Sequence, residues 1–191
     1  SLLKAMRSLE TGVCHIYHKK FDDWTNDRLL EYIAEPTDDR LYAIAQLIRG
    51  GVDLVLIYNR TKIDMFFLEK FKNIVEFERV VEAAPMDIEV LREAKRMGFS
   101  DKFIGQLWGV SQHDMYLLRE KNGIFPVYKM IDTCASEFSS YVPYFYSTYE
   151  DENESLVSDK EKIVVLGSGP IRIGQGVEFD YSTVHAIWSI R

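Results

Sequence analysis

A glycine-rich loop near the end of the chain has residue types that can bind phosphate groups. Gly167 and Gly169 follow an apolar run ending at Leu166, at the first and third positions of a dinucleotide-binding fingerprint. The sixth position, normally a third glycine, is Arg172, and Pro170 restricts the turn. A helix start beside the loop would still offer N–H groups to an anion. The incomplete spacing favours a tight turn that permits close packing over a nucleotide site.

The side chains that could bind a metal or act as nucleophiles do not form a recognisable set. His15 and His18 are spaced to share a helix face, but no acid or cysteine completes a metal site with them. No combination of serine, histidine and acid is recognisable from spacing. Cys14 and Cys134 are too few for a disulfide framework, so we expect reduced thiols. The sequence thus predicts no catalytic residue, metal ligand or cofactor-binding residue in this chain.

Residues 100–122 have the outline of a DNA-reading helix-turn-helix, with a turn at Gly109. The second helix would present Gln112, His113, Asp114 and Tyr116, and it has no basic residue before Arg119. A formal net charge of −7 and an isoelectric point near 5.2 disfavour a nucleic-acid partner, because such proteins usually carry a basic face. A DNA-binding regulator is the alternative hypothesis; an ordinary helix pair is the simpler interpretation.

The composition is that of a globular protein without a membrane segment. The chain has 191 residues, of which 47% are hydrophobic and 28% charged, so it is long enough for one domain or a domain plus part of another. No apolar run approaches the roughly 18–20 residues that span a bilayer. No signal-peptide pattern precedes the first helix. We expect a cytoplasmic protein.

Helical periodicity with clear stop signals dominates the first two thirds of the chain. Apolar residues recur at helical spacing, with glycine or proline between the segments, in residues 1–12, 27–34, 41–48, 52–58, 87–97 and 100–122. No strand alternation is convincing there, so the region is predicted to be all-α. Ser100 and Ser111 are predicted helix caps.

The longest predicted helix begins at Thr61 and runs for about 20 residues, until Pro85. Thr61 is expected to be its N-terminal cap, with Asp64 in the first turn. Its apolar stripe is broad enough to pack on two neighbouring helices or on another chain, and it includes Ile63, Phe66, Phe67, Phe71, Ile74, Val75, Phe77 and Val81. This stripe motivates a prediction of self-association.

The last third of the chain has a different character. Residues 127–150 are rich in tyrosine and serine and predict an ordered but irregular connector, followed by an acidic linker to residue 159. Residues 162–166, KIVVL, are typical of a buried parallel strand, and a helix is predicted from Ser182. A single strand–loop–helix unit needs neighbouring strands, so we expect the domain that begins near Lys160 to continue beyond this chain. The abrupt start at Ser1 leads to the same expectation for the other end.

Several motifs resemble one enzyme family. Residues 126–138, PVYKMIDTCASEF, resemble the PVYKxVDTCAAEF stretch of carbamoyl-phosphate synthase large subunits. Residues 144–150, YFYSTYE, contain that family's YSTYE run, and residues 162–181, KIVVLGSGPIRIGQGVEFDY, are similar to the opening of its second synthetase half. Residues 4–10, KAMRSLE, are similar to the end of its first half. The resemblance covers essentially the whole chain, and it is most specific after residue 126.

The resemblance implies a helical domain between two homologous synthetase halves. On this basis residues 1–15 are the tail of the first half, and 16–126 a helical oligomerisation domain. Residues 127–159 are the connector and linker, and 160–191 the first βα unit of a Rossmann-like pre-ATP-grasp domain. The full-length parent would make carbamoyl phosphate from bicarbonate, ammonia from glutamine and two ATP, for arginine and pyrimidine biosynthesis. It would require ATP, Mg or Mn and K, and a small glutaminase subunit. Neither ATP-grasp domain is expected here, so the chain alone would be non-catalytic.

One functional carry-over follows from the resemblance. In the family, the GQGxEFDY loop lies near an internal passage that carries carbamate between the two sites. Gly176 and Glu178 match that motif, so they are candidate tunnel-lining residues. The alternative is that Glu178 bonds backbone groups at the start of the predicted helix. Both interpretations stay open at the level of sequence.

Overall fold

The computed structural model describes residues 1–191 except 10, 133, 136, 139–143, 166–177 and 191, and leaves out the side chains of 178–180 and 182. It divides into two compact units, residues Ser1–Ser155 and Leu156–Arg191. Among the described residues of the first unit, a 3₁₀ turn at Lys19–Phe21 accompanies eight helices: α1 (Leu2–Ser8), α2 (Asn26–Tyr32), α3 (Arg40–Arg49), α4 (Leu54–Thr61), α5 (Met65–Ala83), α6 (Ile88–Met97), α7 (Asp101–Trp108) and α8 (Gln112–Lys121). The predicted mainly helical fold is confirmed.

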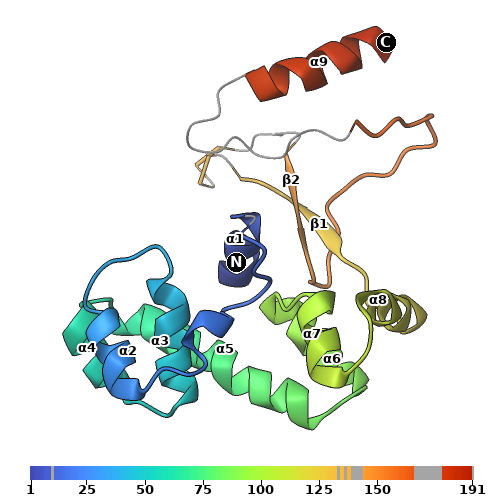
Figure 1. Cartoon of the computed structure of the whole chain (residues 1–191). Helices are drawn as coiled ribbons and strands as arrows, with labels where there is room; N and C mark the ends of the chain where they lie inside the picture. Colours follow the sequence, from blue (N-terminus) through green and yellow to red (C-terminus); the bar gives the residue numbers. More distant parts are fainter. Residues whose placement is uncertain (10, 133, 136, 139–143, 166–177, 191) are drawn as a thin grey trace. The chain divides into compact units, whose positions relative to one another are not determined.

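Helix α5 is the central element of the first unit. It contacts α3 and α4 on one side of the unit and α6 and α7 on the other (Figure 1). Its inward residues Phe71, Ile74, Val75 and Val81 are buried in one continuous apolar core with side chains of the other helices. The apolar stripe of the predicted 20-residue helix therefore packs inside the unit, where it connects the helices before it to those after it.

The caps of three helices test the local predictions. Ser100 and Ser111 are N-caps, and their hydroxyl oxygens accept hydrogen bonds from the N–H groups of Phe103 and Asp114, respectively, each at 3.1 Å. The cap predicted at Thr61 is wrong, because that residue ends α4.

The chain turns between α4 and α5 through a left-handed residue, Lys62, with φ 58°. The Thr61 hydroxyl donates back to the Ile57 carbonyl at 2.8 Å, and Asp64 caps α5 instead, accepting from the N–H of Phe66. Thr61 and Asp64 are both residue types that cap helices well. Because the chain takes an αL turn directly after Thr61, α4 ends there and Asp64 becomes the cap of α5.

The predicted irregular connector contains a β-hairpin. Strand β1 (Val127–Met130) pairs antiparallel with β2 (Phe145–Thr148), with Lys129 opposite Tyr146. The outer edge of β1 is covered by the returning chain, since the Glu154 N–H donates to the Tyr128 carbonyl at 2.8 Å. Valine, tyrosine and phenylalanine favour strands when a partner is near, and this preference outweighs the irregular appearance of the sequence.

The second unit contains one described helix, α9 (Glu178–Ile190), which begins four residues before the predicted start at Ser182. The strand predicted at residues 162–166 is not formed in residues 162–165: Ile163 and Val164 are 67% and 80% exposed. A parallel strand needs a paired neighbour, and the described residues of this unit provide none. Leu166 and the glycine loop after it lie outside the described residues. In the described part of the chain, no helix has the length and apolar character needed to cross a membrane.

Candidate interaction surface

The apolar stripe of α5 divides into an inner and an outer part. Phe71, Ile74 and Val75 are buried, so they are not available to another chain. Phe66 and Phe67, at the start of the helix, are each 57% exposed, and their rings lie 5.4 Å apart in a T-shaped arrangement. Most of the stripe therefore packs on neighbouring helices of the same unit, which is one of the two alternatives that its breadth allowed, while Phe66 and Phe67 at its start stay exposed.

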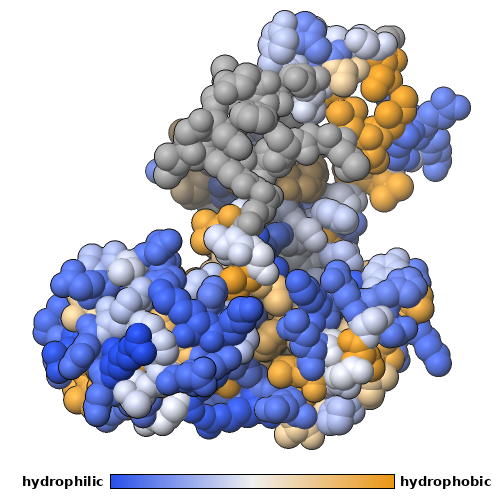
Figure 2. All heavy atoms as spheres, viewed as in Figure 1, coloured by the Kyte–Doolittle hydropathy of each residue, from blue (hydrophilic) through white to orange (hydrophobic). Residues whose placement is uncertain are grey.

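An apolar groove lies beside these two phenylalanines. It has a volume of about 590 Å³ and separates α1 from α5. The α1 side is formed by Leu2, Leu3 and Ala5, and the α5 side by residues from Phe66 to Ile74. Outside such patches, the face of the helical part in Figure 2 is largely hydrophilic. The groove therefore offers apolar surface to a partner, next to the exposed Phe66 and Phe67.

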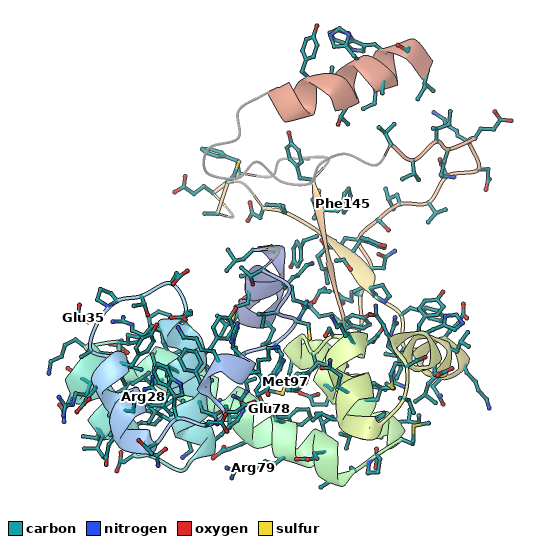
Figure 3. The ribbon with its side chains drawn as sticks, viewed as in Figure 1. Arg28, Glu35, Glu78, Arg79, Met97 and Phe145 are labelled. Carbon is teal, nitrogen blue, oxygen red and sulfur yellow. The ribbon has the colours of Figure 1, made fainter. Side chains whose placement is uncertain are left out.

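A second groove, of about 520 Å³, lies along a charged face of α5. Lys72, Glu76 and Arg79 form one wall, and the segment Gly51–Leu54 forms much of the other. Lys72 and Glu76 make an exposed ion pair at 3.6 Å, and Arg79 donates to the Arg49 carbonyl at 3.0 Å. Figure 3 shows Arg79 at the outer edge of the helical part, while its neighbour Glu78 lies inside.

Glu78 belongs to a buried ion centre behind this face. Its carboxylate accepts two hydrogen bonds from Arg49, each at 2.7 Å, and one contact from His15 Nε2 at 2.9 Å. Arg49 also donates to the Ile16 carbonyl at 2.9 Å. The His15 ring stacks on Phe103 of α7 with centroids 3.7 Å apart. The centre therefore joins α3, α5, α7 and the segment that follows α1.

The geometry of this centre favours a neutral His15 and an ionised Glu78. Burial lowers the pKa of His15, and hydrogen bonding to Glu78 offsets this only in part. His15 Nδ1 is buried without a hydrogen-bond partner, so a proton there would have no acceptor. Burial opposes ionisation of Glu78, but hydrogen bonds from His15 and Arg49 lower its pKa overall.

A second ion centre joins α6, α7 and α8. The Asp101 carboxylate accepts from Lys95 Nζ at 2.8 Å and from Arg119 Nε and Nη2 at 3.0 and 2.9 Å. Both cations also lie near the Tyr149 ring, with Lys95 Nζ 5.0 Å and Arg119 Cζ 5.6 Å from its centroid. Because Tyr149 directly follows β2, this centre fastens the hairpin to the helices.

This second centre also bears on the DNA-binding alternative. Arg119 is 7% exposed and its guanidinium is occupied by Asp101 and the Ile124 carbonyl, so it does not reach a phosphate. Gly105 of α7 packs close to the turn before α8, since a Cβ on it would lie 2.6 Å from the Val110 carbonyl oxygen. The helix pair is therefore explained by packing, and nothing found for this chain supports DNA binding.

The structure describes the two predicted tunnel-lining residues only in part. Gly176 lies outside the described residues, and Glu178 is the first residue of α9, with its side chain left out. Their tunnel role stays a prediction. Of the two histidines considered for metal binding, His15 contacts Glu78, and the His18 ring accepts from the Lys20 N–H. In the described ranges, no group of three or more His, Cys, Asp or Glu side chains is placed to hold a metal ion.

Sequence reasoning missed both ion centres and the role of the acids at their middle, Glu78 and Asp101. For Glu78 a signal exists, because it stands among the inward positions Phe71, Ile74, Val75 and Val81 at helical spacing. An acid in an apolar stripe requires a buried partner. For Asp101 the sequence shows only an acid in a first helical turn, where it suits the helix dipole and suggests nothing more.

Two family models match the chain. Residues 1–123 match the model described as "Carbamoyl-phosphate synthetase large chain, oligomerisation domain". Residues 159–191 match the model described as "Carbamoyl phosphate synthase preATP-grasp domain". The resemblance identified from the sequence motifs is confirmed, and so is the interpretation of the helical region as an interdomain and oligomerisation segment. The chain belongs to the family of carbamoyl-phosphate synthase large chains, and its helical unit carries the oligomerisation domain of that family.

Proposed function

We propose that this chain holds two synthetase halves of a carbamoyl-phosphate synthase together and brings copies of the enzyme into contact. The observation that carries the proposal is the order of the two family matches, with an oligomerisation domain followed on the same chain by the start of a pre-ATP-grasp domain. The division into residues 16–126 for oligomerisation and 160–191 for the second half belongs to this proposal. So does the passage of carbamate along Gly176 and Glu178.

The chemistry of the full-length enzyme is part of the same proposal. It acts as an ATP-dependent ligase that converts bicarbonate, ammonia and two ATP into carbamoyl phosphate, with Mg or Mn and K as cofactors. A small glutaminase subunit supplies the ammonia. The product serves arginine and pyrimidine biosynthesis in the cytoplasm. The family membership supports these statements, while the described residues of this chain contribute the connection and the contact surface.

The chain by itself is expected to be inactive. The purified 191-residue chain, supplied with ATP, Mg²⁺, bicarbonate and ammonia, should form no carbamoyl phosphate above the level without protein. The reason is that the ATP-grasp domains, which would bind ATP, are expected elsewhere in the full-length enzyme, because the two family matches are to an oligomerisation domain and a pre-ATP-grasp domain. Detection of carbamoyl phosphate by trapping with ornithine transcarbamoylase would contradict the proposal, provided the signal scales with the amount of chain.

Self-association of the chain is the direct test of the proposed function. Sedimentation velocity of the pure chain should show a weight-average mass that rises with concentration from monomer towards dimer or a higher species. The expectation follows from the match of residues 1–123 to an oligomerisation domain. A single monomeric boundary at the highest attainable concentration, with a cooperative thermal transition showing that the helices are folded, would contradict it.

A further inference from the structure

A row of outward residues on α5 follows coiled-coil spacing. Successive members are four, three, four, three and four positions apart, so they form one stripe on the helix. Four of them carry charge, and all but the half-buried Met65 are exposed. We call this stripe the α5 charged face: Met65, Glu69, Lys72, Glu76, Arg79 and Ala83.

The signs along this face alternate in a pattern that is complementary to itself. Reading from Glu69 to Arg79, the charges are negative, positive, negative and positive. Reading in the opposite direction gives the opposite sign at every position. A second α5 running antiparallel, with the two-fold axis level with Ile74, would therefore set Glu69 opposite Arg79 of the other copy. It would also set Lys72 opposite Glu76, and Met65 opposite Ala83.

The surroundings of the face leave room for a second helix. The groove of about 520 Å³ runs beside Lys72, Glu76 and Arg79, where outward side chains of a neighbour can lie. The present contacts of these residues are weak. Lys72 and Glu76 pair at 3.6 Å with both side chains at least half exposed, and Arg79 uses one nitrogen on the Arg49 carbonyl. Such exposed pairs can exchange partners at small cost.

We propose that two copies of this chain associate by antiparallel packing of their α5 charged faces, about a two-fold axis that meets this face at the level of Ile74 along the helix. This inference rests on the proposed self-association and names the surface that performs it. The face is favoured over the apolar groove at Phe66 and Phe67 because its charges are complementary to those of its own copy. Exposed charge pairs are screened by salt, so the association weakens as ionic strength rises.

Charge reversal at the two ends of the face tests the proposal. Glu69→Arg places arginine opposite Arg79 twice in each dimer, and Arg79→Glu places glutamate opposite Glu69 twice. Each single variant should dimerise about tenfold more weakly than the unmodified chain, measured by sedimentation equilibrium at low salt. An equimolar mixture of the two variants should recover dimers, because each heterodimer contains two opposite-charge pairs. The mixture is diagnostic, since only direct opposition of positions 69 and 79 predicts recovery.

Glu82→Arg is the matched control, because Glu82 is an exposed acid of the same helix outside the face. It should dimerise like the unmodified chain, and so should Phe67→Ser. If Phe67→Ser dissociates the dimer while the charge reversals do not, the apolar groove is the interface and this inference is wrong. If the charge variants weaken dimers but the mixture fails to recover them, the antiparallel arrangement is wrong. A monomeric unmodified chain would instead refute the proposed function itself.

Discussion

Asp101→Asn should lower the free energy of unfolding by about 3–5 kcal/mol. The Asp101 carboxylate is the shared anion of Lys95 and Arg119, whose side chains are 6% and 8% exposed. Asparagine has nearly the same shape but no charge, so two cations would be left buried against a neutral amide. Removing one partner of a buried pair costs more than the pair itself contributes, because the remaining charge is desolvated without compensation.

Chemical unfolding monitored by circular dichroism measures this effect. Asp23→Asn is the matched control: Asp23 is exposed, and its replacement should change stability by no more than about 0.5 kcal/mol. Adding Lys95→Met to Asp101→Asn should recover part of the loss, because the long apolar side chain replaces one of the uncompensated cations. If Asp101→Asn unfolds at the same denaturant concentration as the control, the ion centre does not hold α6, α7 and α8 together.

The periodic and capped part of the fold could be predicted because its determinants are local. Apolar spacing places α2, α3 and α6 within a residue or two of their observed bounds. Ser100 and Ser111 act as caps because the hydroxyl and its N–H partner lie three residues apart. Thr61 shows the limit of this reasoning. Two capping residues compete within four positions, and the choice depends on how α4 must turn to pack beside α5.

The hairpin and the ion centres were missed because their determinants are distant in sequence. Strand β1 becomes a strand only when residues 145–148 return beside it, and its edge is then covered by Glu154. Tyr149 is held between Lys95 and Arg119, which come from two separate helices. Composition showed crowded aromatics in this region, but no local rule states which of them pair.

Sequence periodicity directs the prediction of self-association to the apolar stripe of α5, whereas the interface that we propose lies on the charged face of the same helix. Sequence periodicity draws attention to the phenylalanine stripe, because apolar side chains must be covered by something. The rest of the same unit covers Phe71, Ile74 and Val75. Besides the exposed Phe66 and Phe67, α5 offers a partner its opposite face, whose charges resemble an ordinary solvated surface. Only the order of the charges distinguishes this face from such a surface, because the same order read backwards gives the opposite sign at every position.

Glu78→Gln should lower the free energy of unfolding by about 3 kcal/mol at neutral pH, near the lower end of the range for broken buried pairs. The Arg49 guanidinium would lose its carboxylate, although it keeps the Ile16 carbonyl and its side chain is 19% exposed. The glutamine oxygen could still accept from His15 Nε2, but the NH2 group would then face the Arg49 guanidinium as a second donor, in a site where His15 is 1% exposed. Glu82→Gln is the matched control, since Glu82 is an exposed acid four positions later on α5 and lies outside the α5 charged face.

The response of stability to acid separates the two partners of this centre. Because burial holds the pKa of folded His15 below its ordinary value of 6.5, the unfolded chain binds the proton first as the pH falls. The stability that neutral His15 contributes is therefore present above 6.5 and is lost as the pH drops towards the folded pKa. The lowered pKa of Glu78 acts in the same direction, but its contribution is lost only further down, below the ordinary carboxyl value of 4.5.

His15→Gln should therefore remove the loss of stability between about pH 7 and pH 5, while Glu78→Gln should keep it. In Glu78→Gln the histidine still titrates and has lost the carboxylate that favoured its charged form, so its folded pKa falls further. Urea unfolding of both variants and of the unmodified chain across this pH range makes the comparison. Equal slopes of stability against pH for the unmodified chain and His15→Gln would show that the buried imidazole is not the titrating group.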